Sequence, residues 1–291
     1  MALSKLKPNS FADVVEGNPS LIINGDMAVA QRGSSAVTVS SGTYSVDRYA
    51  HYESSDGAYT TEQSSEAPNG FSNSLKLSVT TADTSLAAGN YAYILHSIEA
   101  QNLQHLNYGT ASAKNLTLSF WVRSSKTGTY CVAIEKHDNT RYHFIKEYTI
   151  DTADTWEHKA ITIEPDSNIK ASTGAINNDN GLGMRVDFWL AAGTTYNGAT
   201  DGAWSSNTSD FATTNQVNWM DSTSNDFYLT GLKLEVGDTA TPFQHLSYAE
   251  NLLLCERYYQ RDIRHGYYEY GDSRERYYRF LVNAEMRAAP T

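Results

Sequence analysis

Residues 116–122 read LTLSFWV, and residues 227–236 read FYLTGLKLEV. Both stretches alternate apolar with polar residues over much of their length, which is typical of a β-strand with one buried and one wet face. Residues 75–79, LKLSV, and residues 160–164, AITIE, show the same alternation. Clusters of Gly, Asn, Asp and Ser lie between such runs and are typical of turns. These stretches therefore predict strands joined by turns.

Further strand candidates extend the pattern along most of the chain. The stronger one is residues 183–191, GMRVDFWLA, and the weaker ones are residues 46–54, 59–64, 91–99, 130–135 and 142–150. About ten strands without helical periods between them predict antiparallel sheets, packed as two layers. We expect an all-β fold, a jelly-roll β-sandwich, while a different Greek-key sandwich would give similar spacing.

Composition narrows the class of protein. The chain has 291 residues, with 33 acidic and 22 basic side chains and a formal net charge of −11. This length suits one large β domain or two smaller ones. Aromatic residues make up 12% of the chain, too many for a disordered protein. An acidic chain repels phosphate, which argues against general nucleic-acid binding.

The sequence contains no membrane segment or disulfide framework. No apolar run approaches the roughly 18 residues of a membrane helix. Residues 1–11, MALSKLKPNSF, lack the apolar centre of a secretory signal. Cys131 and Cys255 are too few for a disulfide framework.

The two ends differ from the central region. Residues 1–20 are expected to form an arm that attaches to another protein, followed by a domain over residues 21–245. Residues 248–259 have the helical pattern, with Ser247 and Glu250 placed as a capping box. Residues 256–291 hold seven Arg and seven Tyr and carry a net charge of +1, against −12 for the first 255 residues.

Residues 246–291 are therefore expected to form a helix and a β segment that support oligomerisation, because Arg and Tyr are enriched at interfaces. Leu252, Cys255 and Tyr259 fall on one helix face and are the expected contact residues. Packing of the helix on its own sandwich is the alternative.

Sugar binding is the chemistry that the aromatic residues favour. A sugar ring stacks its C–H face on Trp or Tyr, while nearby polar groups bind its hydroxyls. Residues 193–225 form a long polar segment whose aromatic residues favour an ordered loop. Its candidate ligand-binding residues are Trp204, Trp219, Tyr196 and Asp201, while anchoring of the loop is the alternative role for the two tryptophans. Trp121 and Trp189 lie in apolar strand runs and are expected in the core.

Catalysis is not favoured by any motif. No spacing singles out one pair among the 33 acids for glycoside hydrolysis. The chain has no nucleophile elbow, phosphate-binding Walker loop or HExxH metal motif. We therefore expect a protein that is not an enzyme.

Two groups of ordered motifs resemble a module of bacteriophage tail-fibre and other virion proteins. The opening group is LIINGDM at residues 21–27, QRG at 31–33 and SVDRY at 45–49. The closing group is YLTGLKLEVG at 228–237, ATPFQH at 240–245 and LCERYYQ at 254–260. LVNAEMRAAPT at 281–291 is similar to the start of a following β element in that family. The family's aromatic residue after Asp-Arg is usually Trp, and here it is Tyr49.

The resemblance implies a jelly-roll domain similar to carbohydrate-binding modules, in a virion protein made in the host cytoplasm. It implies a homotrimeric, non-enzymatic tail-fibre adhesin that recognises host-surface polysaccharide. A capsid or tail decoration, cement or adaptor protein is the alternative, and an accessory glycan-binding module of a secreted enzyme is a further one. No cofactor is expected, except that such modules allow a structural Ca²⁺, for which Asp26, Asp47 and Asp226 are the candidate ligands. Independently of the resemblance, Arg32 and Asp47 are expected to pair across the sheet.

Overall fold

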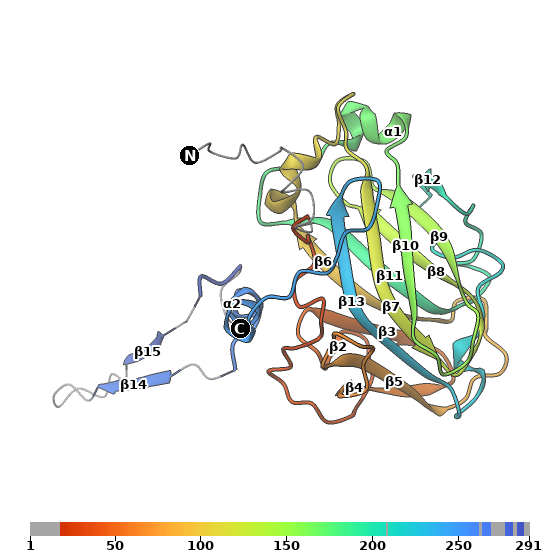
Figure 1. The fold of residues 1–291 in the computed structure, drawn as a ribbon, viewed down its shortest axis with the longest axis horizontal. Coiled ribbons are helices and arrows are strands. Elements are labelled where there is room, and N and C mark those ends of the chain that lie inside the picture. The colour runs from red at the N-terminus through yellow and green to blue at the C-terminus, as the bar shows by residue number, and fades with distance from the viewer. Residues whose placement is uncertain (1–17, 208, 262–263, 269–276, 282–283, 288–291) are drawn as a thin grey trace, which may run out of the picture.

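The structure, a computed structural model, describes residues 18–207, 209–261, 264–268, 277–281 and 284–287. Two antiparallel sheets pack face to face (Figure 1). The first sheet has the strand order β1 (Val37–Thr38), β4 (Ala58–Ser64), β5 (Ser74–Thr81), β13 (Asp226–Val236), β7 (Leu116–Ser124), β10 (Glu157–Ile163). The second has the order β12 (Ala203–Ser205), β9 (Tyr142–Ile150), β8 (Gly128–Lys136), β11 (Leu182–Ala192), β6 (Tyr91–Glu99), β3 (Tyr49–Ser54), β2 (Thr43–Tyr44).

The chain crosses repeatedly between the two sheets, as in a jelly-roll β-sandwich. The predicted all-β jelly roll is confirmed, and each of the ten predicted strands is present. The short helical elements are η2 (Ala100–Leu106), α1 (Ser167–Lys170), η3 (Ser172–Gly174), η4 (Trp219–Asp221) and α2 (Tyr248–Glu256). A separate pair, β14 (Arg264–Tyr268) and β15 (Tyr277–Leu281), follows α2. No helix in the described part of the chain is long and apolar enough to cross a membrane.

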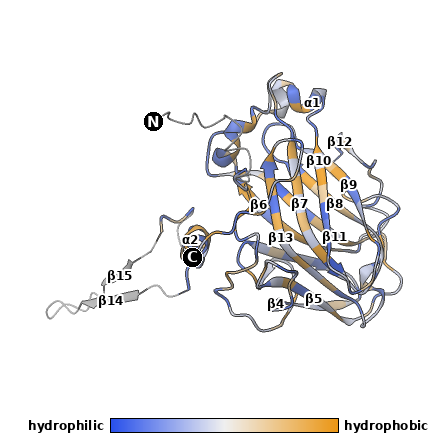
Figure 2. Ribbon diagram, in the orientation of Figure 1, coloured by the Kyte–Doolittle hydropathy of each residue, from blue (hydrophilic) through white to orange (hydrophobic). Residues whose placement is uncertain are grey.

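One large apolar core fills the space between the sheets. Alternate residues of each strand point into it, and Figure 2 shows hydrophobic residues concentrated along the strands. Phe120 of β7 packs edge-on against Phe188 of β11, with ring centroids 4.9 Å apart, and joins the two layers. The strand alternation read from the sequence therefore corresponds to real burial.

Of the two tryptophans expected in the core, Trp189 is buried as predicted, but in a second cluster, while Trp121 is partly exposed on an outer face. In β7, Phe120 and Val122 face the core, so Trp121 between them faces outward, next to His158 of β10. In β11, Phe188 faces the core, and the adjacent Trp189 joins a second apolar cluster on the outside of the second sheet. The apolar sequence around both residues correctly predicts strands. The face on which each tryptophan lies depends on which alternate positions of the strand point into the core.

Helix α2 begins as predicted but packs against its own sandwich. Ser247 and Glu250 form the predicted capping box. Cys255 is 1% exposed. The Arg32 guanidinium stacks on the Tyr259 ring, with the Arg32 Cζ 3.5 Å from the ring centroid. Leu252 is half-buried. The prediction that Leu252, Cys255 and Tyr259 form the exposed contact stripe was therefore wrong in its choice of face.

Helix α2 contacts the segment that carries the opening motifs. The buried Asn251 donates from Nδ2 to Asp26 Oδ1 at 2.8 Å and accepts from the Asn24 backbone N–H at 3.1 Å. Arg32 pairs with Asp47 at 3.6 Å, so the predicted pair forms, but it joins two turns and does not cross a sheet. The opening and closing sequence motifs thus meet in space, on one side of the sandwich.

Candidate functional site

The outer face of the second sheet carries a row of stacked rings. Strand register places Tyr52 of β3 opposite Tyr93 of β6, and Tyr93 opposite Trp189 of β11. The Tyr52 and Tyr93 rings are 5.3 Å apart at an interplanar angle of 11°, and Tyr93 and Trp189 are 4.8 Å apart at 20°. Phe211 continues the row 5.1 Å beyond Trp189, at 17°. These four residues are called the aromatic row below.

The aromatic row has a buried end and an accessible end. Trp189 is 2% exposed and Phe211 is 9% exposed, while Tyr52 and Tyr93 are only partly buried. Beyond β3, strand β2 pairs only with Ala50 and His51, so β3 is the sheet edge at Tyr52. The Tyr52–Tyr93 end therefore presents ring surface outward, and packing fixes its orientation.

The segment after β11 covers the buried end. Tyr196 packs against Trp189, with ring centroids 5.8 Å apart, and meets Tyr91 edge-on at 5.5 Å. Gln216 accepts from the Cys131 backbone N–H at 2.7 Å and donates to the Trp189 carbonyl at 3.2 Å. The described residues of the long polar segment are therefore ordered on the sheet, as its aromatic content predicts.

A charged cluster lies beside the aromatic row, beginning at Asp187, two residues from Trp189 along β11, and reaching Arg185 two residues further. Glu135 of β8 is opposite Arg185 of β11, which donates to Glu135 and to Asp187 at 3.0 Å each. Arg141 Nε donates to Glu135 at 2.8 Å. The cluster consists of Glu135, Arg185, Asp187, Arg141, His137 and His143.

The two acids of the cluster have opposite pKa shifts. Burial alone would raise the pKa of Glu135, but hydrogen bonds with His137 and His143 and the charge of Arg185 hold it well below its usual range. Burial raises the pKa of Asp187 to about 6, against the opposing charge of Arg185. Asp187 Oδ1 and Trp189 Nε1 are buried without a protein partner. The side chains of Arg185 and Arg141 remain partly accessible and can donate hydrogen bonds to a ligand on this face.

The residues predicted from sequence as a sugar site do not form one group. Trp219 is 0% exposed and packs edge-on against Tyr59 in the core, which corrects its expected surface position. Trp204 lies on β12, packs against Phe144 and donates to the Glu164 carbonyl at 2.8 Å. Its segment was predicted correctly as ordered, but its ring anchors a sheet edge.

Asp201 and Tyr196 also have separate surroundings. Asp201 is exposed, pairs with Lys146 at 2.5 Å and accepts from the Glu147 backbone N–H at 2.8 Å. Of the four predicted residues, Tyr196 alone belongs to the aromatic surroundings of Trp189.

Sequence reasoning missed Tyr52, Tyr93, Tyr91 and Arg185. A signal was present in residues 91–93, Tyr-Ala-Tyr, because residues two apart in a strand share a face. The pairing of Tyr93 with Tyr52 and Trp189 had no such signal, since it depends on the order of β3, β6 and β11.

The predicted calcium ligands are not gathered at one point. Asp26 accepts from Asn251, and Asp47 is occupied by Arg32 and by Gln31, whose side chain donates at 2.5 Å. The carbonyl of Gly25, the residue before Asp26, accepts from the Leu232 backbone N–H in β13. Leu232 is six residues from Asp226, about 20 Å along a strand, so Asp26 and Asp226 lie far apart. Among the described residues, no three His, Cys, Asp or Glu side chains form a group that suits a metal ion.

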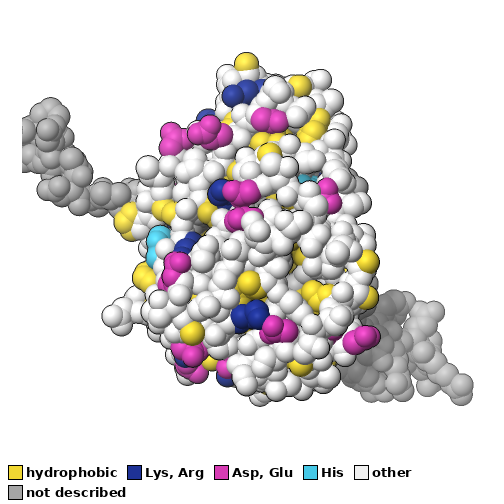
Figure 3. Space-filling view, turned by 90° about the vertical axis from the view of Figure 1, so that its right-hand side faces the viewer, with side chains coloured by type: hydrophobic (Ala, Val, Ile, Leu, Met, Phe, Trp, Pro, Cys, Tyr) yellow, Lys and Arg dark blue, Asp and Glu magenta, His cyan; other side chains and the backbone are white. Residues whose placement is uncertain are grey.

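Charge is mixed on the face shown in Figure 3. Basic and acidic side chains occur there in small neighbouring groups, without a broad patch of one sign. Such a face has no electrostatic footprint for a nucleic-acid backbone.

Comparison with known proteins gave matches among solved structures only. No family model matches the chain, and no curated protein sequence matches it. The structure is similar to the enzymatically active domain of tailspike protein 4 of bacteriophage CBA120, at 14% identity and a TM-score of 0.36. That match covers 68% of this chain and only 21% of the tailspike chain.

Two further matches are with carbohydrate-binding modules. The family 11 module from Clostridium thermocellum, in complex with a β-1,3-1,4-mixed-linked tetrasaccharide, matches at 13% identity and a TM-score of 0.36, covering 71% of this chain and 98% of the module. The N-terminal tandem family 22 modules of Paenibacillus barcinonensis Xyn10C match at 15% identity and a TM-score of 0.36, covering 64% of this chain and 46% of theirs.

Proposed function

We propose that the protein binds a glycan on the outer face of the second sheet, at the accessible end of the aromatic row. The observation that carries this proposal is the Tyr52–Tyr93 pair, held parallel and partly exposed at the sheet edge. Sugar rings stack on such rings through their apolar C–H faces. Prior ordering of the rings lowers the entropy cost of binding.

The charged cluster supplies the polar part of recognition. Arg185 and Arg141 keep part of their surface accessible while Glu135 fixes their positions. Fixed donors beside an apolar platform are the usual composition of a small-ligand site, and they give orientation and specificity. A sugar stacked at Tyr93 would direct its hydroxyls toward this cluster.

We infer that this binding is non-enzymatic. Glu135 and Asp187 are both 0% exposed, and Arg185 bridges them. Glycoside hydrolysis needs two carboxyl groups that reach the scissile bond from a cleft. A pair that is buried and neutralised by arginine suits the anchoring of donors better than hydrolysis.

We further propose that the protein is a homotrimeric phage virion component, most simply a tail-fibre adhesin for host polysaccharide. The support is the series of opening and closing motifs, which the fold brings together around Asn24 and Asn251. Attachment to other virion proteins through residues 1–20 is part of this proposal, although residues 1–17 lie outside the described part. A capsid or tail decoration role is the alternative that shares the fold.

The test is a glycan array, or immobilised polysaccharide from candidate host cells, probed with the full chain and with Tyr52→Ala and Tyr93→Ala variants. Loss of a central aromatic anchor costs about 1–2 kcal/mol, so each variant should bind about tenfold more weakly. Circular dichroism and thermal unfolding should stay close to wild type, because both rings are partly exposed.

Trp121→Ala is the matched control. Trp121 is a partly exposed aromatic residue on the outer face of the first sheet, far from the aromatic row. It should leave glycan binding unchanged. Loss of binding in Trp121→Ala with retention in both tyrosine variants would move the site to the other sheet. Absence of binding to every glycan would refute the proposal as a whole.

A further inference from the structure

The chain beyond α2 leaves the sandwich and returns to the same place. Arg257 donates to both carboxylate oxygens of the buried Glu99, at 2.8 and 2.9 Å. Gln260 donates to the Ala284 carbonyl at 3.1 Å, and the Arg287 backbone N–H donates to the Arg257 carbonyl at 2.9 Å. The base of this excursion is therefore fixed to the sandwich.

The excursion contains a ribbon made of β14 and β15. The two strands pair antiparallel, from Arg264 opposite Leu281 to Tyr268 opposite Tyr277. Figure 1 shows the ribbon projecting beyond α2, away from the sandwich, and no other sheet of the described chain includes it. An isolated two-stranded ribbon is marginally stable in water, and its outer edges offer unpaired backbone groups. The ribbon therefore requires a surface outside its own sandwich.

An apolar surface lies on and beside α2. Six large apolar side chains of the described residues are clearly exposed, and four of them fall within nine residues of sequence. They are Leu246, Tyr248, Leu253 and Leu254, exposed by 45, 59, 53 and 41%, and are called the docking face below. Exposed apolar groupings of this kind usually mark interaction sites.

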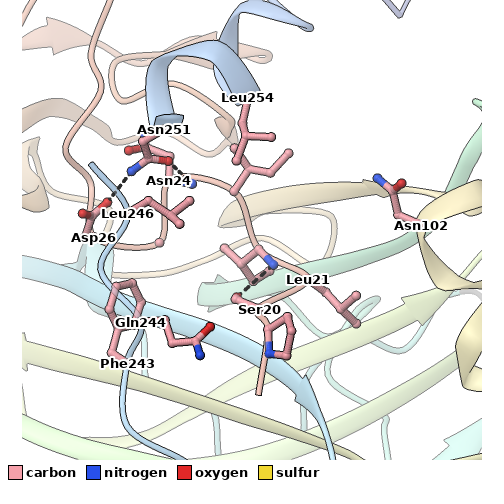
Figure 4. A pocket seen from close by; sticks show the side chains of 14 residues that line it. Ser20, Leu21, Asn24, Asp26, Asn102, Phe243, Gln244, Leu246, Asn251 and Leu254 are labelled. Atoms are coloured by element: carbon pink, nitrogen blue, oxygen red, sulfur yellow. Dashed lines mark hydrogen bonds between the residues drawn. The ribbon is translucent and has the colours of Figure 1, made fainter. Parts of the chain in front are cut away.

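A cavity of about 300 Å³ opens beside the docking face (Figure 4). Leu246 and Leu254 line it together with Leu21 and Phe243. Cavities of this kind at interfaces hold the aromatic or arginine anchor of a partner. The cavity therefore gives the docking face a place for one large side chain.

The composition of the ribbon complements this surface. Its two strands, RHGYY and YYRFL, hold five Tyr or Phe and two Arg but no acid. Residues 246–256 hold Glu250 and Glu256 but no Lys or Arg. Apolar and charge complementarity thus coincide between two parts of the same sequence.

We propose that the ribbon of one copy of this chain docks on the docking face of a second copy. The ribbon projects away from its own α2, so the complementary surface must come from another molecule. This contact is heterologous, and such contacts close into rings when the rotation between copies allows it. The inference deepens the assembly part of the proposed function and is independent of glycan binding.

Two variants of the full chain test the contact. The first replaces Leu253 and Leu254 by Asp, and the second replaces residues 262–283 by a short Gly-Ser linker, which the Gln260–Ala284 contact permits. Light scattering after size-exclusion chromatography should show an oligomer for wild type and monomers for each variant. An equimolar mixture should give complexes of two chains, because the first variant keeps its ribbon and the second keeps its docking face.

The mixing result separates this contact from other modes of assembly. A Leu253/Leu254 variant that keeps the wild-type mass would mean that ribbons pair with each other, and would overturn the proposal. A mixture that stays monomeric, or a monomeric wild type, would also overturn it. Val37→Asp, an exposed apolar residue on β1, is the matched control and should keep the wild-type mass. Glycan binding per chain should persist in all variants, so its loss would concern the aromatic row alone.

Discussion

Within the opening motif, Asn24 is a position where few other residues could take the place of the native side chain. Its side chain donates to the carbonyls of Val29 and Asp47 at 2.9 and 3.0 Å and accepts from the Val29 N–H at 2.9 Å. Its φ is +60°, in the left-handed region that Asn tolerates better than most residues. A buried amide in this conformation holds three chain segments together.

The adjacent Gly25 is required for a different reason. Its carbonyl accepts from the Leu232 N–H of β13 at 2.9 Å, and a Cβ on it would lie 2.1 Å from the Leu232 carbonyl oxygen. Gly25→Ala should therefore lower the free energy of unfolding by about 2–4 kcal/mol, measured by urea denaturation. Gly89→Ala is the control, because a Cβ there meets nothing within 4 Å. Equal stability of the two variants would contradict this account.

His51 gives a prediction for pH dependence. It is 0% exposed, and burial lowers its pKa from 6.5 to about 3. The unfolded chain therefore binds a proton below pH 6.5 that the folded chain does not bind, so stability falls as pH decreases from 6.5 toward 3.

His51→Gln removes this titration and can keep a hydrogen bond to Thr61, which His51 makes at 3.0 Å. Between pH 7 and pH 5 the variant should lose about 2 kcal/mol less stability than wild type. Urea denaturation at the two pH values measures the difference. Equal losses in both proteins would show that His51 is not held neutral.

At the scale of elements, register creates the candidate site. Tyr52, Tyr93 and Trp189 belong to three strands, and the first and last of these residues are 189 − 52 = 137 positions apart in sequence. They align because β3, β6 and β11 are neighbours. The same register sets Arg185 opposite Glu135 on β8. A slip of one residue in β6 would turn Tyr93 into the core and Ile94 out to solvent.

At the scale of the whole molecule, α2 belongs to the sandwich, although sequence motifs suggested a boundary at residue 245. The Arg48 Cζ lies 3.3 Å from the Tyr258 ring centroid, and the buried Cys255 lies near Asp26, Asp47 and Arg48 of the opening segment. Removal of residues 246–261 would expose Asn24 and Arg48 to water together, because Asn251 and Tyr258 contact them.

Two truncations test this boundary. A chain ending at residue 245 should be less stable than a chain ending at residue 261 by about 3 kcal/mol or more, because only the shorter one loses buried contacts. Both lack the ribbon, so assembly does not affect the comparison, which chemical denaturation measures. Equal unfolding free energies would place α2 outside the cooperative unit.

The sequence by itself determined the ten strands, the capping box of α2 and the Arg32–Asp47 pair. These follow from local alternation, local capping chemistry and the opposite charges within one motif. Only the tertiary structure decided that Trp219 is core, that Trp121 and Trp189 face outward, and that Tyr52 and Tyr93 form a row. Face and neighbourhood depend on strand phase and strand order, which are set by contacts between residues far apart in the sequence.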